Sequence, residues 1–150
     1  MKKASIIVLV VLLTLSVWGC SSKTPITANE FQAKMTAAGF EIIDAYDQLG
    51  GGDAEAALIA INDDYQIEFY VVPTEAQAIT AFNQNKRNFE DAKGNSSSNT
   101  SVALANYGVY KLSTGGMYYV ISRIDNTFIY IVTDAANKAS VDENLKVLGY

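Results

Sequence analysis

Carboxylates are the side chains in this sequence best suited to chemistry. They gather around two turn-like segments: Asp44, Asp47, Asp53, Glu55, Asp63 and Asp64. Two carboxyls facing each other across a groove could act as acid and base in a glycosidase-type hydrolysis, and several converging oxygens could bind calcium. Neither group has the spacing of an EF-hand loop, and aspartate favours turns for reasons of backbone geometry alone. We therefore interpret these acids as solvated turn residues, with paired-carboxylate catalysis and a calcium site as the alternatives.

Two common catalytic residue types are missing or single: histidine is absent and cysteine occurs once. The chain has no histidine, which removes the commonest general base, the commonest metal ligand and the Ser-His-Asp triad. The glycine segment 49–53 lacks the lysine and the spacing of a phosphate-binding loop. The one cysteine, Cys20, has no histidine to activate it. These absences favour a protein that is not an enzyme and that uses no metal or cofactor.

The position of Cys20 is informative, because it directly follows the most hydrophobic stretch of the chain. Lys2 and Lys3 precede an apolar run over 4–18, and the small residue Gly19 separates that run from the cysteine. This order of charge, apolar run and small residue is typical of a signal peptide, and the run is short for a membrane-spanning helix of ~20 residues. An uncleaved membrane anchor at the N-terminus is the alternative.

Val17, Gly19 and Cys20 resemble the lipobox of bacterial lipoproteins. In that family the signal peptide is removed before the cysteine, whose sulfur and amino group then carry lipid. The resemblance implies an acylated Cys20 that holds the protein to the lipid bilayer of the cell membrane or outer membrane, on its extracytoplasmic side. Each buried methylene contributes about 0.8 kcal/mol, so two acyl chains anchor a protein stably. A lipidated Cys20 could not also act as nucleophile, metal ligand or half of a disulfide.

This interpretation divides the chain into a signal peptide over 1–19, a short tether over 20–26 and a single domain over 27–150. The whole chain has a formal net charge of −5, and without Lys2 and Lys3 the balance becomes more negative still. A net negative domain with scattered basic residues is poorly suited to binding nucleic acid. The tether is short, so we expect the domain to lie close to the membrane.

Residue patterns predict an α+β domain with an antiparallel sheet. Capping residues before apolar stripes predict helices at 27–39, 73–91 and 133–150. Alternating apolar residues predict strands at 40–46, 54–62, 65–72, 107–113, 117–124 and 127–132, although the alanines of 54–62 also suit a helix. The polar low-complexity segment 92–101 is predicted to be an exposed, mobile loop.

A strand–turn–strand–helix pattern occurs twice, ending in the helices at 73–91 and 133–150. Two such units can each place a helix on the same side of a shared sheet. We therefore expect about six or seven strands with about three helices packed on one face of the sheet. The opposite face would then be free of helices.

Tyrosines are candidates for a binding surface on that helix-free face. Strand alternation places Tyr118 and Tyr119 on opposite faces of the sheet. The open face would expose Tyr70 together with one of these two, and exposed aromatic patches commonly bind a partner. Core packing and dimerisation are the alternatives for these side chains.

Arg123 and Asn126 are the most distinctive polar pair. Arg123 lies near the end of a strand built otherwise from Tyr, Val and Ile, and Asn126 follows in the next turn. The guanidinium could bind an anionic ligand on the open face. Alternatively, Arg123 pairs with an acid such as Glu68 on a neighbouring strand, or caps the turn, and such cross-strand pairs are common.

The C-terminal part resembles small, uncharacterised bacterial lipoproteins whose domains end in a hairpin and a helix closing on Leu-Gly-Tyr. The matching residues are Ser122, Arg123, Asn126, Thr127, Ile129, Tyr130, Leu148, Gly149 and Tyr150. That family carries no known activity, so the resemblance implies a cell-envelope location and an architecture only. Together these observations favour a membrane-anchored, non-catalytic lipoprotein that binds a protein partner or small ligand on its sheet face. A histidine-independent hydrolase with paired carboxylates and an inhibitor or immunity-type lipoprotein are the alternatives.

Overall fold

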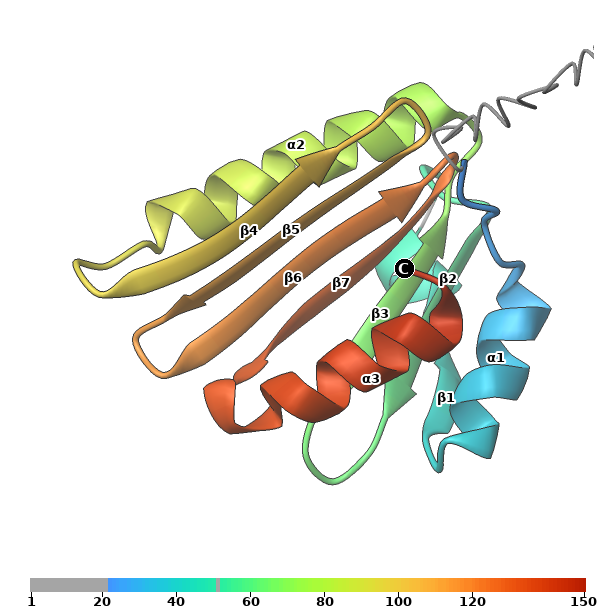
Figure 1. Ribbon diagram of the computed structural model, residues 1–150. Helices are drawn as coiled ribbons and strands as arrows, with labels where there is room; N and C mark the ends of the chain where they lie inside the picture. Colours follow the sequence, from blue (N-terminus) through green and yellow to red (C-terminus); the bar gives the residue numbers. More distant parts are fainter. Residues whose placement is uncertain (1–21, 51) are drawn as a thin grey trace, which may run out of the picture.

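The computed structural model describes residues 22–50 and 52–150, so the predicted signal peptide and Cys20 lie outside the described residues (Figure 1). The elements in chain order are α1 (Ala28–Ala37), β1 (Glu41–Asp44), the π-helical turn η1 (Tyr46–Gly50), β2 (Ala56–Ile61), β3 (Gln66–Val71), α2 (Glu75–Asp91), β4 (Ser97–Ala103), β5 (Tyr107–Thr114), β6 (Met117–Ile124), β7 (Thr127–Asp134), the 3₁₀ turn η2 (Ala135–Asn137) and α3 (Lys138–Leu148). Within these ranges no helix combines the length and the apolarity needed to cross a membrane.

The strands form one seven-stranded antiparallel sheet in the order β1-β2-β3-β7-β6-β5-β4 (Figure 1). Each of its two halves is a run of hairpins, β1 to β3 and β4 to β7, and β7 joins the halves by pairing with β3. In that central pair Tyr70 lies opposite Phe128. The predicted α+β fold with an antiparallel sheet of six or seven strands is therefore confirmed.

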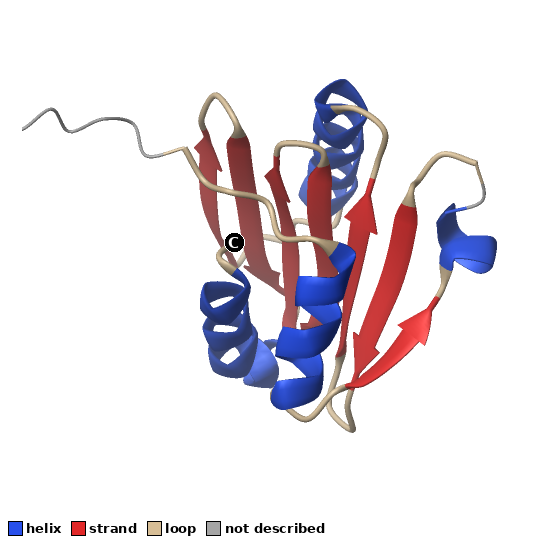
Figure 2. Cartoon of the chain, turned by 90° about the vertical axis from the view of Figure 1, so that its right-hand side faces the viewer, coloured by secondary structure: helices blue, strands red, loops and turns tan. Residues whose placement is uncertain are grey.

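The expectation that all helices lie on one face is wrong. α1 and α3 pack on one face of the sheet, hereafter the α1/α3 face, and α2 packs on the opposite one, the α2 face (Figures 1 and 2). The central strands explain this arrangement, because they are apolar on both sides. In β6 Val120 belongs to the core under α1 and α3, whereas its neighbour Ile121 belongs to the core under α2. A strand that is apolar on both faces has to be covered on both.

The sequence predicts the ends of the helices more reliably than the face of the sheet on which they pack. Thr27 and Glu30 form the predicted capping box of α1, with the Thr27 N–H donating to Glu30 Oε2 at 2.8 Å. Thr74 caps α2 by accepting the Gln77 N–H at 3.2 Å. Gly149 ends α3 in the left-handed conformation with φ 88°.

The loop predicted over 92–101 is wrong in its second half, where the edge strand β4 begins. β4 pairs with β5 along its whole length, from Ser97 opposite Thr114 to Ala103 opposite Gly108. An edge strand whose side chains face water needs no apolar alternation, so its serines, threonine and asparagine resemble a loop in sequence. The predicted strand over 54–62 is confirmed by β2.

The core is split between the two faces. On the α1/α3 face, Phe31 of α1 stacks on Phe69 of β3 with ring centroids 4.7 Å apart. On the α2 face, Phe82 sits above Gly108 of β5, where a Cβ atom would lie 3.2 Å from the Phe82 ring. The absence of a side chain at Gly108 therefore allows α2 to lie close to the sheet.

The segment predicted as a tether is attached to one end of the sheet. The Lys23 N–H donates to Asn106 Oδ1 at 3.3 Å, and Asn106 Nδ2 donates to the Lys23 carbonyl at 2.6 Å. Lys23 Nζ also donates to the Gly149 carbonyl at 3.1 Å and lies 4.9 Å from the centroid of the Tyr107 ring. Partial burial and the nearby Lys111 lower the pKa of Lys23. We call this set of contacts the Lys23 clip.

Candidate ligand-binding groove

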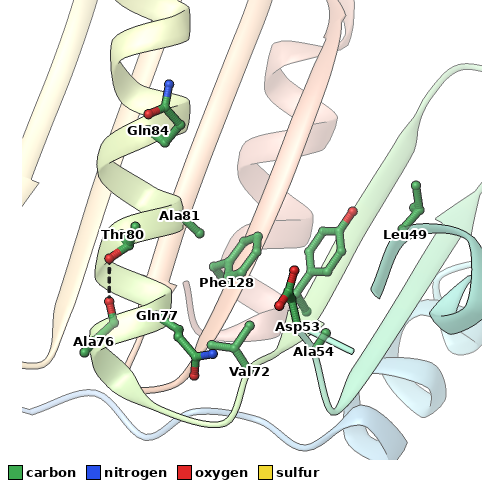
Figure 3. Close-up of a pocket in the computed structure, with 11 residues that line it drawn as sticks. Leu49, Asp53, Ala54, Val72, Ala76, Gln77, Thr80, Ala81, Gln84 and Phe128 are labelled. Carbon is green, nitrogen blue, oxygen red and sulfur yellow. Dashed lines mark hydrogen bonds between the residues drawn. The ribbon is translucent and has the colours of Figure 1, made fainter. Parts of the chain in front are cut away.

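A groove lies on the α2 face, between α2 and the half of the sheet that ends in β1. α2 packs mainly over β5, β6 and β7, which leaves space beside it over β3. The groove has a volume of about 590 Å³, within the range of small-molecule sites. Its lining residues are Leu49, Asp53, Ala54, Tyr70, Val72, Ala76, Gln77, Thr80, Ala81, Gln84 and Phe128 (Figure 3).

One wall of the groove is a stripe of small and polar side chains on α2. Ala76, Thr80 and Gln84 follow one another at intervals of four residues, so they share one side of the helix. Thr80 is turned onto its own helix, where its Oγ1 donates to the Ala76 carbonyl at 2.9 Å (Figure 3). The opposite wall includes Leu49 of η1, whose side chain is 50% exposed. Short side chains on α2 and an unburied leucine across from them keep the groove open.

The floor of the groove is a stacked pair of aromatic rings. Tyr70 of β3 and Phe128 of β7 are direct partners across the central strand pair, with ring centroids 4.6 Å apart and planes inclined by 16°. The Tyr70 hydroxyl donates to Glu68 Oε2 at 2.7 Å. Burial, followed by this hydrogen bond and the charge of Glu68, raises the pKa of Tyr70 well above its ordinary value. The phenol therefore stays protonated and remains a donor to Glu68.

A smaller recess of about 200 Å³ adjoins the groove and shares Tyr70 and Phe128 with it. Its other lining residues are Glu68, Asn85 and Tyr130. Tyr130 lies opposite Glu68 in the β3–β7 pair, and burial, with a contribution from Glu68, raises its pKa. The recess thus combines aromatic rings with one carboxylate and one amide.

The charge of the two cavities is one-sided. Asp53 lines the groove and Glu68 lines the recess, and no lysine or arginine among the described residues lines either cavity. Arg87 of α2 donates to Gln84 Oε1 at 2.8 Å but is not part of the lining. Such a site suits an apolar ligand that is neutral or positively charged.

The predicted pair of Arg123 and Asn126 lies outside the groove lining. The Arg123 side chain is buried, with the residue 7% exposed, and its Nη1 lies 3.2 Å from Glu75 Oε1 in the first turn of α2. The acid that pairs with Arg123 is thus on a helix, and it is not Glu68. Asn126 Nδ2 donates to the Val72 carbonyl at 2.8 Å, so Asn126 braces the link between β3 and α2. The Arg123 guanidinium and the Asn126 amide are thus both engaged by other groups of the protein.

The three candidate tyrosines lie in different parts of the fold and do not form one surface. Tyr118 is 1% exposed in the core of the α1/α3 face, where its hydroxyl donates to Asp142 Oδ1 at 2.8 Å. Tyr119 lies on the α2 face beneath the helix, and its ring centroid is 5.1 Å from the ring centroid of Phe89. Tyr70 is the one predicted ligand-binding residue in the groove lining. A continuous aromatic surface on a helix-free face does not form, because α2 covers part of that face.

The turn acids mainly satisfy backbone groups or face solvent. Asp44 Oδ1 accepts the Tyr46 N–H at 3.0 Å, as expected for a turn residue. Across residues 22–50 and 52–150, no three Asp, Glu, Cys or His side chains come together as a metal site. Asp53 is the single carboxylate among the described residues that line the groove, so these residues form no facing pair of acids in it.

Sequence reasoning missed Phe128 and the side of α2 that lines the groove. The sequence predicts that Phe128 lies in a strand, but its stacking on Tyr70 depends on β7 returning to pair with β3. The stripe of Ala76, Thr80 and Gln84 is visible in sequence as small and polar residues at helical spacing. Such a stripe cannot be distinguished from an ordinary solvent-facing side of a helix.

Comparisons with known proteins add little. No family model matches the chain, and no curated protein matches it. Among solved structures, a GTP binding regulator from Thermotoga maritima is similar over 83% of this chain and 88% of its own, with 14% sequence identity and a TM-score of 0.44. A likeness at that level indicates nothing about what this chain binds.

Proposed function

We propose that this protein is a membrane-anchored lipoprotein of the bacterial cell envelope that binds a small ligand and catalyses no reaction. The observation that carries the binding role is the groove of about 590 Å³ with the stacked floor of Tyr70 and Phe128. Small-molecule sites are lined mainly by apolar and aromatic side chains with a few polar groups, and the groove has this composition. A protein partner remains an alternative occupant of the same surface.

The chemistry of the groove supports binding over catalysis. A hydrolase with paired carboxylates needs two acids facing each other across the substrate, and the groove lining offers Asp53 alone. Glu68 lines the adjoining recess and accepts hydrogen bonds from neutral donors, among them Gln66 Nε2, which donates to its Oε1 at 3.0 Å. Within residues 22–50 and 52–150, no nucleophile with an activating base accompanies either acid in these linings.

The anchoring part of the proposal rests on the order of residues around Cys20 and is tested by metabolic labelling. Cells expressing the full chain are fed a palmitate analogue, and the wild type is compared with Cys20→Ser. We expect the label and the membrane fraction to be lost together in the variant. A Ser22→Ala variant is the matched control and should keep both. An unlabelled wild-type protein that retains Met1 would contradict the anchoring role.

The binding role is tested by filling the groove. Thr80→Trp places an indole on the wall of the groove, whereas Asn83→Trp places one on an exposed part of α2 outside the lining. We expect an apolar fluorescent probe to bind the wild type and Asn83→Trp alike, and to bind Thr80→Trp at least about tenfold more weakly. Equal binding to all three proteins would rule out the groove as the ligand site.

A further inference from the structure

Glu68 is a partly buried carboxylate without a cation. Its two oxygens accept hydrogen bonds from the Tyr70 hydroxyl at 2.7 Å and from Gln66 Nε2 at 3.0 Å. Both donors are neutral, and among the residues that the structure describes no lysine or arginine forms an ion pair with Glu68. Withdrawing a carboxylate from water is costly unless a positive charge compensates it.

The surroundings of Glu68 favour a positive charge in a second way. The rings of Tyr70, Phe128 and Tyr130 line the same recess as the carboxylate. Aromatic faces attract cations, and they do so more strongly where water is partly excluded. Three rings and one acid in a recess of about 200 Å³ therefore provide two kinds of attraction for the same charged group.

Hydrogen-bond capacity at the recess indicates a cation that carries N–H donors. A carboxylate has about four acceptor positions, and the contacts from Tyr70 and Gln66 use two of those on Glu68. Asn85 also lines the recess, and its Nδ2 donates to the Ala81 carbonyl at 3.0 Å, which leaves its Oδ1 as an acceptor. A primary ammonium group could donate to both.

We infer that the recess and groove together bind a small primary ammonium compound with an apolar or aromatic body. The ammonium group lies in the recess against Glu68 and the tyrosine rings, and the body lies in the groove between α2 and Leu49. This inference rests on the proposed function, since it names the class of ligand for the same groove. Anionic ligands are excluded from the class, because no basic residue in the part of the chain that the structure describes lines either cavity.

The test uses three probes of similar size that differ in charge. Full-length protein in nanodiscs of zwitterionic lipid is titrated by calorimetry with phenethylammonium, 2-phenylethanol and 3-phenylpropanoate. We expect the cation to bind about tenfold or more tightly than the neutral alcohol, because a charge-assisted hydrogen bond is roughly twice as strong as a neutral one. The anion should bind most weakly.

Two variants separate recognition of the charge from occupancy of the groove. Glu68→Gln keeps an acceptor for Tyr70 and should reduce affinity for phenethylammonium to that of 2-phenylethanol. Glu143→Gln removes the same charge from an exposed position on α3 and should leave the affinity unchanged. Thr80→Trp should weaken binding of the cation and of the alcohol.

The outcomes distinguish this inference from the proposed function. If the alcohol binds as tightly as the cation, or if Glu68→Gln binds the cation like the wild type, the cation inference is wrong while the groove remains a ligand site. If Thr80→Trp leaves the binding of every probe unchanged, or if no probe binds the wild type, both proposals are wrong.

Discussion

The guanidinium of Arg123 lies beneath the first turn of α2, where Glu75 Oε1 approaches its Nη1 to 3.2 Å. Arg123 is buried, whereas the Glu75 side chain is 45% exposed. The pair therefore connects a strand of the sheet to the start of the helix that walls the groove. A buried guanidinium that loses its acid keeps the cost of desolvation without the compensating charge.

We predict that Glu75→Gln lowers the free energy of unfolding by about 1–2 kcal/mol, less than for a fully buried pair because Glu75 is half in water. Urea denaturation of the wild type and the variant measures the change. Glu143→Gln, an exposed acid elsewhere, serves as the control and should change stability by less than about 0.5 kcal/mol. Equal stability of Glu75→Gln and the wild type would show that Arg123 needs no partner.

Single residues also show which contacts can be predicted from sequence and which cannot. The capping pairs at Thr27 and Thr74 were predictable because both partners of each cap lie within three residues of each other. The stack of Tyr70 on Phe128 was not, because it requires two strands from different halves of the chain to pair in one register. Contacts between distant segments carry no local sequence signal.

At the scale of elements, α3 is fixed to the sheet through Asp142. Its Oδ1 accepts from Lys111 Nζ of β5 at 2.6 Å and from the Tyr118 hydroxyl of β6 at 2.8 Å, and Lys138 Nζ lies 3.4 Å from its Oδ2. Desolvation raises the pKa of Asp142, but the hydrogen bonds from Lys111 and Tyr118 outweigh it, with help from the charges of Lys111 and Lys138. The pKa is therefore below its ordinary value of 3.8.

This shift predicts a pH dependence of stability. Because the folded pKa of Asp142 is lower than the unfolded one, its stabilising effect is complete above the unfolded pKa and is lost as pH falls through the folded pKa. We predict that Asp142→Asn lowers the free energy of unfolding by about 1–2 kcal/mol at neutral pH. The loss should shrink at acid pH, as the wild-type carboxyl becomes protonated below its ordinary pKa of 3.8. Urea denaturation at both pH values measures it, and an equal loss at both would contradict the shift.

The contact between α2 and β5 depends on Gly108. A methyl group there would lie 3.2 Å from the Phe82 ring, so either the ring or the helix has to move. We predict that Gly108→Ala lowers the melting temperature, at a cost of about 1–2 kcal/mol. In a Phe82→Leu background the same change should cost less, because the shorter side chain makes room. Additive losses in the double variant would place the strain elsewhere.

The side of the sheet on which each helix packs could not be read from sequence. The amphipathic stripes of α2 and α3 show that each helix buries one side, but a stripe does not say which face of the sheet receives it. The decisive residues are in the central strands, where Val120 and Ile121 face opposite cores. The edge strand β4 was missed for a related reason, since its backbone pairs while its side chains remain polar.

At the scale of the whole molecule, the Lys23 clip holds the start of the described chain against the domain. Lys23 is followed by Thr24, so its peptide bond is a potential trypsin site. We predict that Asn106→Ala, which removes two of the clip's hydrogen bonds, speeds trypsin cleavage after Lys23 severalfold, because proteolysis follows local opening. Cleavage after Lys93, near the far end of α2, is the internal control. An unchanged rate after Lys23 would show that the clip does not protect it.

The Lys23 clip also limits how the domain can turn at a membrane. If Cys20 is acylated as proposed, two residues separate it from Lys23, so the Cα atoms of Cys20 and Lys23 lie at most about 11 Å apart. The domain then cannot turn freely over the bilayer. The end of the sheet that carries Asn106, near the Gly149 carbonyl that follows α3, has to face the lipid. Every copy would then hold its aromatic groove at nearly the same distance from the bilayer and in nearly the same orientation.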